Sequence, residues 1–594
     1  MTDAARLSKD LGTEKIIWNL TDLYPATDSK QFNDDVSWCE RESLAIGNDC
    51  RGTIEKLSAK QLFDLVYRIE HMEIRLGKLC TFAFLHFITQ VDNEQAGALY
   101  QTIHELVSTC TKETVFFELE WNKLDDDCAN TLLKDPQLAG YHHYLQSMRR
   151  YRPHQLLEVE ERLLIETKAV GRKSWTTLFE KVIGQLRFGE RGRTEEEVLS
   201  DLYHQDRTIR AQAADDLTAG LKSQSHILTH IYNTLAADKM ISDRLRNHQI
   251  WVSAMNLDNQ VNDDTVDTLV TAVTSRYDIV NRYYHQKTTL LGFDTLYDYD
   301  RYAPLPGLPT TTIDWLRCKE MVLESFGEFS EVMRACAEQF FTKSWIHAPV
   351  MSGKRGGAFA HPCVPEIHPY IMANFTGTVR DVSTIAHELG HGVHQVLAAD
   401  NGYFNSHTPL VLAETASVFA ELLVFKSQLK IIDSPLEKQA FICQKLESIF
   451  ATVFRQVAMN RFENSMHEGR RVQGELTSEQ LSLSWMQTQQ EMFGDSVTLR
   501  DEYRIWWSYI PHFLSTPGYV YSYAFGELLV LALYGIYQHE GRPFISKYLD
   551  LLSAGGSASP YELLKPFDID LNDPSFWHHG LNVIDKMLSE AIEM

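Results

Sequence analysis

The 594-residue sequence lacks the cysteine spacing, the long apolar segments and the basic excess that mark several large classes of protein. Its nine cysteines are scattered, odd in number and without a C-x-x-C pair, which argues against a disulfide framework or a cysteine-based zinc finger. The longest apolar run, near 528–537, is about half a membrane span, and no apolar signal segment follows Met1. Lys and Arg number 56 against 80 Asp and Glu, and a net charge of −24 repels phosphate backbones. We therefore expect a cytoplasmic protein with no nucleic-acid or membrane partner.

The composition also lacks the signs of disorder, because hydrophobic residues make up 44% and charged residues 23%, as in ordinary globular proteins. Helical spacing dominates, and helix starts carry capping patterns, in which a hydroxyl and a side chain three positions later satisfy free backbone groups. These patterns are Thr194-x-x-Glu197, Ser434-Pro435-x-Glu437 and Thr477-x-x-Gln480. They predict a mainly α protein. The segment 187–193 has two glycines and no apolar periodicity, which predicts an N-terminal helical domain of 1–193 and a second domain of 194–594.

One region, 352–378, departs from the helical pattern. Three glycines at 353, 356 and 357 are followed by 369–375, which has the character of short extended segments. This predicts a small β-sheet directly before a helix that begins at the capping pattern Thr378-x-x-Asp381.

The predicted helix after Thr378 contains His387-Glu388-Leu389-Gly390-His391. Histidines four residues apart lie one above the other on a helix and can hold one metal ion, while the adjacent Glu388 can act as general base toward a metal-bound water. The alternative is a helix whose histidines are only hydrogen-bonded.

A catalytic zinc site needs a third protein ligand. Leu397 stands where a metzincin would have histidine, and His394 is about 10 Å of helix rise from His387, so it is expected to be structural or to support a ligand. The remaining option is Glu414, about two turns into a following helix that would begin at Thr408-Pro409. Glu421, seven residues further, is placed to orient a ligand histidine or to be a solvated charge.

The segment 384–394, followed by Ala413-Glu414-Thr415-Ala416-Ser417, resembles oligoendopeptidase F in the thimet oligopeptidase family of zinc metallopeptidases. Further segments are similar to this family from one end of the chain to the other: 18–24, 353–359, 374–377, 461–463, 474–476, 510–513 and 519–523. The resemblance implies a mainly α, two-lobed molecule with a deep channel and a small β-sheet beside the zinc helix. It also implies one Zn²⁺ per chain, bound by His387, His391 and Glu414, and cleavage of internal bonds in short peptides.

The resemblance implies further site residues. His512 and Tyr523 match family positions that contact substrate or stabilise the oxyanion, and Tyr519 matches more loosely. Gly518 departs from the aromatic residue expected there. From the residues themselves, a strand at 374–376, including Asn374, could pair with a substrate strand, and Gly356 could allow close approach of substrate.

The prediction is therefore a zinc-dependent endopeptidase in which Glu388 activates water and Tyr523 and His512 aid the oxyanion. Two alternatives stay open at this point. One is a metallocarboxypeptidase, and the other is a non-catalytic peptide-binding scaffold with a structural metal. The expected partners are short peptide substrates.

Overall fold

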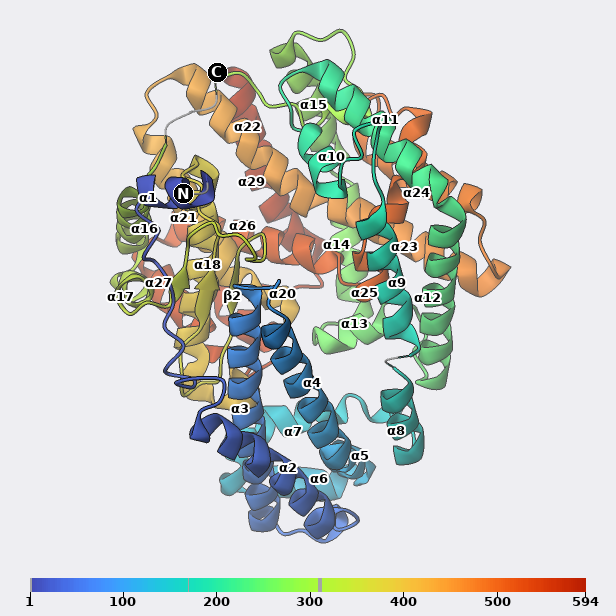
Figure 1. Ribbon diagram of the computed structural model, residues 1–594, viewed down its shortest axis with the longest axis vertical. Helices are drawn as coiled ribbons and strands as arrows, with labels where there is room; N and C mark the ends of the chain where they lie inside the picture. The colour runs from blue at the N-terminus through green and yellow to red at the C-terminus, as the bar shows by residue number, and fades with distance from the viewer. Residues whose placement is uncertain (1–2, 169, 308–311) are drawn as a thin grey trace. The chain divides into compact units, whose positions relative to one another are not determined.

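The computed structural model describes residues 3–168, 170–307 and 312–594, and it divides the chain into two compact units (Figure 1). The first unit contains residues 1–162, 310–431 and 536–568, and the second contains 163–309, 432–535 and 569–594. Each unit is therefore built from three segments that are distant in sequence. The boundary predicted after Arg193 falls inside the second unit and stays a prediction about domains defined by sequence.

Both units consist mainly of helices, which confirms the predicted fold class. The helices of the first unit are α1 (Asp3–Asp10), α2 (Lys30–Cys50), α3 (Ala59–Ile88), α4 (Glu94–Thr114), α5 (Phe116–Lys123), α6 (Asp126–Leu133), α7 (His142–Arg149), α16 (Trp315–Phe329), α17 (Glu331–Thr342), α18 (Val379–Ala398), α19 (Tyr403–Ser406), α20 (Leu410–Ala413), α21 (Thr415–Ile431), α27 (Arg542–Ala554) and α28 (Pro560–Leu564).

The helices of the second unit are α9 (Arg172–Gln185), α10 (Glu195–Asp201), α11 (Arg207–Ser223), α12 (Ser225–Leu245), α13 (Ser253–Asp258), α14 (Asp263–Thr274), α15 (Tyr277–Leu291), α22 (Pro435–Thr452), α23 (Phe454–Gln473), α24 (Ser478–Phe493), α25 (His512–Ser515) and α29 (Pro574–Glu593). Two helices, α8 (Glu158–Thr167) and α26 (Tyr521–Glu540), contribute residues to both units. Short 3₁₀ helices include η4 (Asp298–Asp300), η5 (Ala399–Asn401) and η6 (Asp501–Tyr509).

The capping patterns form as the sequence predicts, with one exception. At the starts of α10, α18 and α24, the hydroxyl accepts from the backbone three residues on, and the acidic or amide side chain accepts in return. At α22 the Ser434 hydroxyl accepts from the Glu437 backbone, but Glu437 does not return the bond. Three of these four helix starts are therefore fully capped by residues that can be identified in the sequence.

The predicted small sheet is present in the first unit, with three strands in the order β1, β3, β2. The strands are β1 (Ile346–His347), β2 (Phe359–His361) and β3 (Tyr370–Met372), where β3 pairs parallel to β1 and antiparallel to β2. The extended segment predicted at 374–376 is not a strand, because β3 ends at Met372 and the backbone after it leads into the cap of α18. The outer strands of the sheet are therefore β1 and β2.

Each unit has its own hydrophobic core. In the first unit, buried side chains of the N-terminal helices pack with Tyr370 and Met372 of β3, which fixes the sheet against α3. In the second unit, α9–α12 pack with α23, α24 and η6 around buried aromatic residues that include Trp506 and Trp507.

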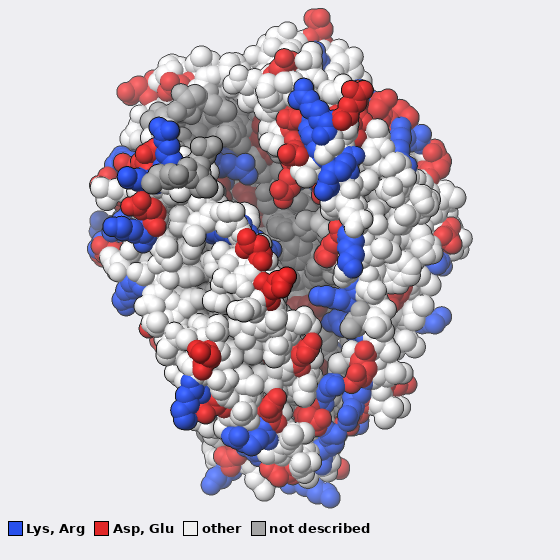
Figure 2. All heavy atoms as spheres, viewed as in Figure 1, with Lys and Arg blue, Asp and Glu red and all other residues white. Residues whose placement is uncertain are grey.

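Charged side chains of both signs are interspersed on the face drawn in Figure 2, although the chain as a whole carries a net charge of −24. Within the described residues, no helix has the length and apolar character needed to cross a membrane.

Candidate metal centre

The centre lies where α18 packs along α21 in the first unit (Figure 1). Gly390 makes this approach possible, because a Cβ atom on it would lie 2.5 Å from the Cα of Ser417 and 2.6 Å from the carbonyl oxygen of Ala416. Real Cβ atoms do not approach other atoms so closely, so only glycine lets the two backbones meet here. The close packing brings Glu414, the residue directly before α21, next to the histidines of α18.

His387, His391 and Glu414 direct three donor atoms toward one point, with all three atoms within 4.8 Å of one another. The Nε2 atoms of His387 and His391 lie 3.3 and 3.5 Å from Oε2 of Glu414. Ligands at about 2.0–2.1 Å from one tetrahedral ion stand about 3.3 Å apart. Two imidazoles and one carboxylate at these separations therefore fit a zinc ion.

The second ring nitrogen of each histidine has a partner that fixes the ring's orientation. Nδ1 of His387 lies 3.5 Å from Oε2 of Glu421, and the ring of His391 bonds to the backbone of Ala413. Such partners select the tautomer in which Nε2 is free to bind metal. Burial lowers the pKa of His387, but Glu421, Glu414 and Glu388 outweigh it and raise this pKa to about 9. The three carboxylates around His387 therefore favour a positive charge at this centre.

Glu388 is buried at 7% exposure next to His387 in α18. One of its carboxylate oxygens accepts a hydrogen bond from the backbone N–H of Ala360 in β2. Burial raises the pKa of Glu388 to about 7, and Glu414 acts in the same direction, while His387 and the Ala360 bond oppose the shift. A carboxyl group with a pKa near neutrality can both take up and release a proton, as a general acid–base requires.

Glu414 occupies a different backbone position from the predicted one. The sequence predicts Glu414 about two turns into a helix, whereas the structure places it in the break between α20 and α21, with α20 only four residues long. The Ser417 hydroxyl donates to its Oε2 at 2.7 Å. From this break the carboxylate faces α18, where its Oε2 lies 3.3 Å from Nε2 of His387 and 3.5 Å from Nε2 of His391.

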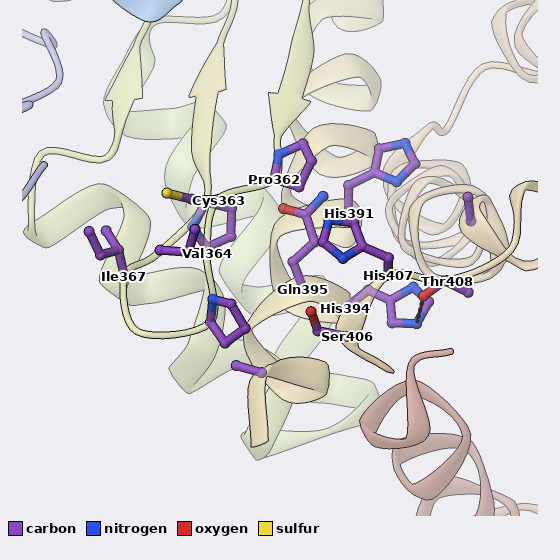
Figure 3. Close-up of a pocket in the computed structure, with 14 residues that line it drawn as sticks. Pro362, Cys363, Val364, Ile367, His391, His394, Gln395, Ser406, His407 and Thr408 are labelled. Carbon is purple, nitrogen blue, oxygen red and sulfur yellow. Dashed lines mark hydrogen bonds between the residues drawn. The ribbon is translucent and has the colours of Figure 1, made fainter. Parts of the chain in front are cut away.

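His394, one turn beyond His391, is buried and its Nε2 lies 3.3 Å from the Thr408 hydroxyl. It lines a cavity of about 190 Å³ together with His391, Gln395, His407 and the loop after β2 (Figure 3). His394 is not part of the three-ligand cluster.

Gly356 lies on the loop before β2, and Asn374, in the segment between β3 and α18, contacts that loop. The Asn374 amide donates to the carbonyl oxygens of Arg355 and Gly357, both at 2.9 Å, and so brackets Gly356. Lys354 holds the same loop through three backbone carbonyls, of His347, Pro349 and Ala373. Sequence reasoning missed Lys354, whose only signal is its place in a glycine-rich segment.

His512, Tyr519 and Tyr523 form a separate group in the second unit. The Tyr523 hydroxyl lies 3.5 Å from Nε2 of His512, and the rings of Tyr519 and Tyr523 meet nearly at right angles with centroids 4.9 Å apart. Burial lowers the pKa of His512, and Arg455 lowers it further. Sequence reasoning also missed Arg455, a single basic residue between Phe454 and Gln456 at the start of α23.

The backbone between these residues is fixed by Glu463. Its Oε1 accepts the Gly518 N–H at 2.8 Å, and Gly518 has a φ of +81°. The glycine that departs from the family pattern is therefore required by its own backbone conformation.

Comparison with known proteins gives matches over most of the chain. The profile described as "Peptidase family M3" matches residues 315–583, and the one described as "Oligopeptidase F" matches 120–188. Oligopeptidase PepF of Bacillus subtilis is 25% identical over 602 residues, covering 97% of this chain and 87% of the relative. An oligoendopeptidase F homologue of Lactococcus lactis subsp. lactis is 26% identical over 601 residues, covering 97% of each chain. The crystal structure of oligoendopeptidase F from Enterococcus faecium superposes with a TM-score of 0.74 at 23% identity, covering 96% of this chain and 99% of that one.

Proposed function

This chain belongs to peptidase family M3, in its oligoendopeptidase F group, and is a metalloendopeptidase; we propose that it hydrolyses internal bonds of short oligopeptides with one zinc ion per chain. The observation that carries the proposal is the convergence of His387 Nε2, His391 Nε2 and Glu414 Oε2, with Glu388 beside them. A cytoplasmic location belongs to the same proposal, and nine free thiols are consistent with a reducing compartment.

His387, His391 and Glu414 would hold the ion, and Glu421 and the Ala413 backbone would orient the two imidazoles. Bound zinc supplies a Lewis acid that polarises the scissile carbonyl and makes water more acidic. Two imidazoles and one carboxylate are the donor set that zinc takes in peptidases, which supports zinc over harder ions.

Glu388 takes the proton of the attacking water and delivers it to the leaving amine. The Ala360 N–H holds one carboxylate oxygen, which leaves the other free to move the proton. Burial matters here because it keeps the pKa near 7, so neither protonation state is strongly favoured at neutral pH.

Negative charge then develops on the carbonyl oxygen of the substrate. We assign Tyr523 and His512 to donate hydrogen bonds to it, since a phenol and a neutral imidazole N–H are both suitable donors. The lowered pKa of His512 keeps the ring neutral at pH 7, with one N–H to donate. Tyr519, Asn374 and Gly356 are assigned to substrate contacts.

The proposal is tested with Glu388→Gln, which keeps the shape of the side chain and removes its basicity. We expect zinc content near one per chain in both proteins and a fall in kcat of at least about 10³-fold in the variant, because the proton carrier is lost. The matched control is Glu320→Gln, an exposed residue of α16 paired with Arg317, which should retain full activity. A Glu388→Gln enzyme as active as the parent would disprove the mechanism.

The position of cleavage is tested with a peptide blocked at both ends and analysed by mass spectrometry. An endopeptidase cuts this peptide internally, whereas a carboxypeptidase requires a free C-terminus. Chelation of the metal should abolish the products, and restored zinc should return them.

A further inference from the structure

Two arginines of the second unit, Arg301 and Arg455, lie against the same tyrosine. Nη1 of Arg455 donates to the Tyr302 hydroxyl at 3.0 Å, and the Arg301 guanidinium carbon lies 4.6 Å from the centre of the Tyr302 ring. Neither arginine has a carboxylate within 4.0 Å among the residues that the structure describes. Uncompensated guanidinium groups away from bulk water are costly, so their presence needs an explanation.

Two other buried basic residues of this unit, Arg210 and Lys287, are each paired with a carboxylate. Arg210, only 1% exposed, donates to the buried carboxylate of Asp300 at 2.8 Å. Lys287, also buried, pairs with Glu447 at 2.5 Å and so adds little net charge near Tyr302. The unpaired state of Arg301 and Arg455 is thus a local feature and not a general property of the unit.

Arg301 is buried among aromatic rings, and its Nε has no hydrogen-bond partner within the described residues. It is 4% exposed, its guanidinium lies over the rings of Tyr302 and Tyr503 at 4.6 and 4.8 Å, and its Nη1 donates to the Tyr503 hydroxyl at 2.8 Å. Cation–π contacts and this bond hold it in place without neutralising it. It therefore supplies a fixed positive charge behind Tyr302.

Arg455 is different, because the residue is only half-buried. Within the described part of the chain its Nη2 atom makes no hydrogen bond and is not fully buried, whereas its Nε atom is buried without a partner. The Tyr302 hydroxyl accepts from Nη1, which leaves its own proton available for a ligand. One Arg N–H and one phenol O–H thus remain free side by side, a combination suited to a carboxylate.

The electrostatics of Tyr302 point the same way. Burial raises its pKa, but the charges of Arg301 and Arg455 and the Arg455 hydrogen bond, with a smaller contribution from Lys287, outweigh burial, and the net shift is downward. Arg455 also lowers the pKa of His512, so the positive charge of Arg455 acts on a residue assigned to the oxyanion. The cluster favours a negative charge next to the substrate-contacting residues of this unit.

We propose that Arg455 and Tyr302 form a subsite that binds a carboxylate of the peptide substrate, with Arg301 as the fixed charge behind it. The subsite rests on the proposed function, since it defines which peptides that same centre cuts best. A carboxylate can come from the C-terminus of the peptide or from an Asp or Glu side chain, and the two sources are separable by synthesis.

The test uses two matched sets of fluorogenic peptides with blocked N-termini. In the first set each peptide exists as the C-terminal carboxylate and as the amide. In the second set every peptide has a C-terminal amide. Each peptide carries one Glu at a different position, and it is compared with the peptide that has Gln at that position. In the wild-type enzyme we expect kcat/KM to favour the carboxylate or the Glu form by about tenfold or more in one set, mainly through KM.

In Arg455→Met this ratio should fall to about one, in Arg455→Lys it should be intermediate, and in Tyr302→Phe it should fall several-fold. The control is Arg504→Met, which removes the same charge from an arginine paired with Glu479 and Asp501 on the surface and should keep the wild-type ratio. A merely structural role would lower kcat/KM for both members of a pair and leave the ratio unchanged, which would overturn the proposal.

The kinetics of the wild-type enzyme alone can also disprove the subsite, so the test does not depend on whether the variants fold. Equal kcat/KM for charged and neutral members in both sets would disprove the subsite, even with the metal mechanism intact. If Glu388→Gln proved fully active, the proposed function would fail, and the subsite would still be tested by the affinity of the wild-type protein for a carboxylate peptide against its amide. Equal dissociation constants would then overturn it.

Discussion

Next to the candidate ligand His387, the Glu421 carboxylate lies 3.5 Å from Nδ1 of the ring and is not itself part of the candidate metal cluster. Its carboxylate accepts from Nδ1 and so raises the basicity of the ring and fixes its tautomer. We expect Glu421→Gln to weaken zinc binding by about 10–100-fold while the fold is retained. Zinc affinity measured by competition with a chromophoric chelator checks this.

The matched control for Glu421→Gln is Glu328→Gln, a surface residue of the same unit paired with Lys430. It changes the charge by the same amount and should leave zinc affinity unaltered. An unchanged affinity in Glu421→Gln would show that Glu421 is only a buried charge beside the ring.

Glu463 gives the clearest dependence of stability on pH. Burial raises its pKa to about 8, while the Gly518 N–H and Lys239 oppose the shift, and the nearby His467 stays neutral because burial lowers its pKa strongly. Since the folded pKa lies above the unfolded one, Glu463 contributes stability that is fully present below about pH 4.3 and is lost as pH rises to about 8.

The slope of this loss is at most about 1.4 kcal/mol per pH unit. Glu463→Gln keeps an acceptor for Gly518 but cannot ionise, so the difference in unfolding free energy between wild type and variant should shift in favour of the variant between pH 5 and 8. Thermal or urea unfolding across this range measures the difference. A pH-independent difference would mean that Glu463 is ionised throughout.

Among the helices, the packing of α18 on α21 depends on Gly390. An alanine Cβ would collide with the Ala416 carbonyl and the Ser417 Cα, which are backbone atoms and cannot move alone. We expect Gly390→Ala to separate the two helices, to destabilise the protein by about 2 kcal/mol or more, and to weaken zinc binding because Glu414 moves with α21. Unfolding midpoint and zinc affinity are measured on the same preparation.

Gly535, in the interior of α26, provides the control, because a Cβ there meets no atom within 4 Å. Alanine has the higher helix propensity, so Gly535→Ala should stabilise by about 0.5–1 kcal/mol and leave zinc affinity unchanged. A loss of zinc in both variants would point to an indirect effect of glycine substitution on the preparation.

Several helices and strands around the metal centre could be predicted from local sequence patterns. The capping pair Thr378 and Asp381 predicts where α18 begins, and the spacing of His387 and His391 predicts that both rings share a face. The glycine-rich segment predicts a sheet before the helix, which is present.

Other features depend on contacts between distant segments, which no local pattern encodes. Glu414 meets the histidines because α21 packs along α18, and the Ala360 N–H meets Glu388 because β2 forms an edge of the sheet. Arg455 and Tyr302 are more than 150 residues apart and meet through the fold of the second unit. For the same reason, two units of three segments each could not be predicted from composition along the chain.

For the molecule as a whole, charge acts at two ranges. The net charge of −24 produces a long-range field that attracts basic peptides, and this field is screened over about 8 Å at 0.15 M salt but extends about 30 Å at 0.01 M. The subsite at Arg455 acts by contact and has the opposite sign. The two effects should therefore separate with ionic strength.

We expect kcat/KM for a basic peptide to exceed that for its neutral counterpart at 0.01 M salt, and this advantage to shrink towards 0.15 M and above. The preference for a single carboxylate, which depends on direct hydrogen bonds to Arg455 and Tyr302, should persist over the same range because contact pairs are screened far less. Steady-state kinetics at four or five salt concentrations follow both ratios together. Equal kcat/KM for basic and neutral peptides at the lowest salt would show that the net charge does not attract the substrate. This conclusion would not depend on the outcome at the carboxylate subsite.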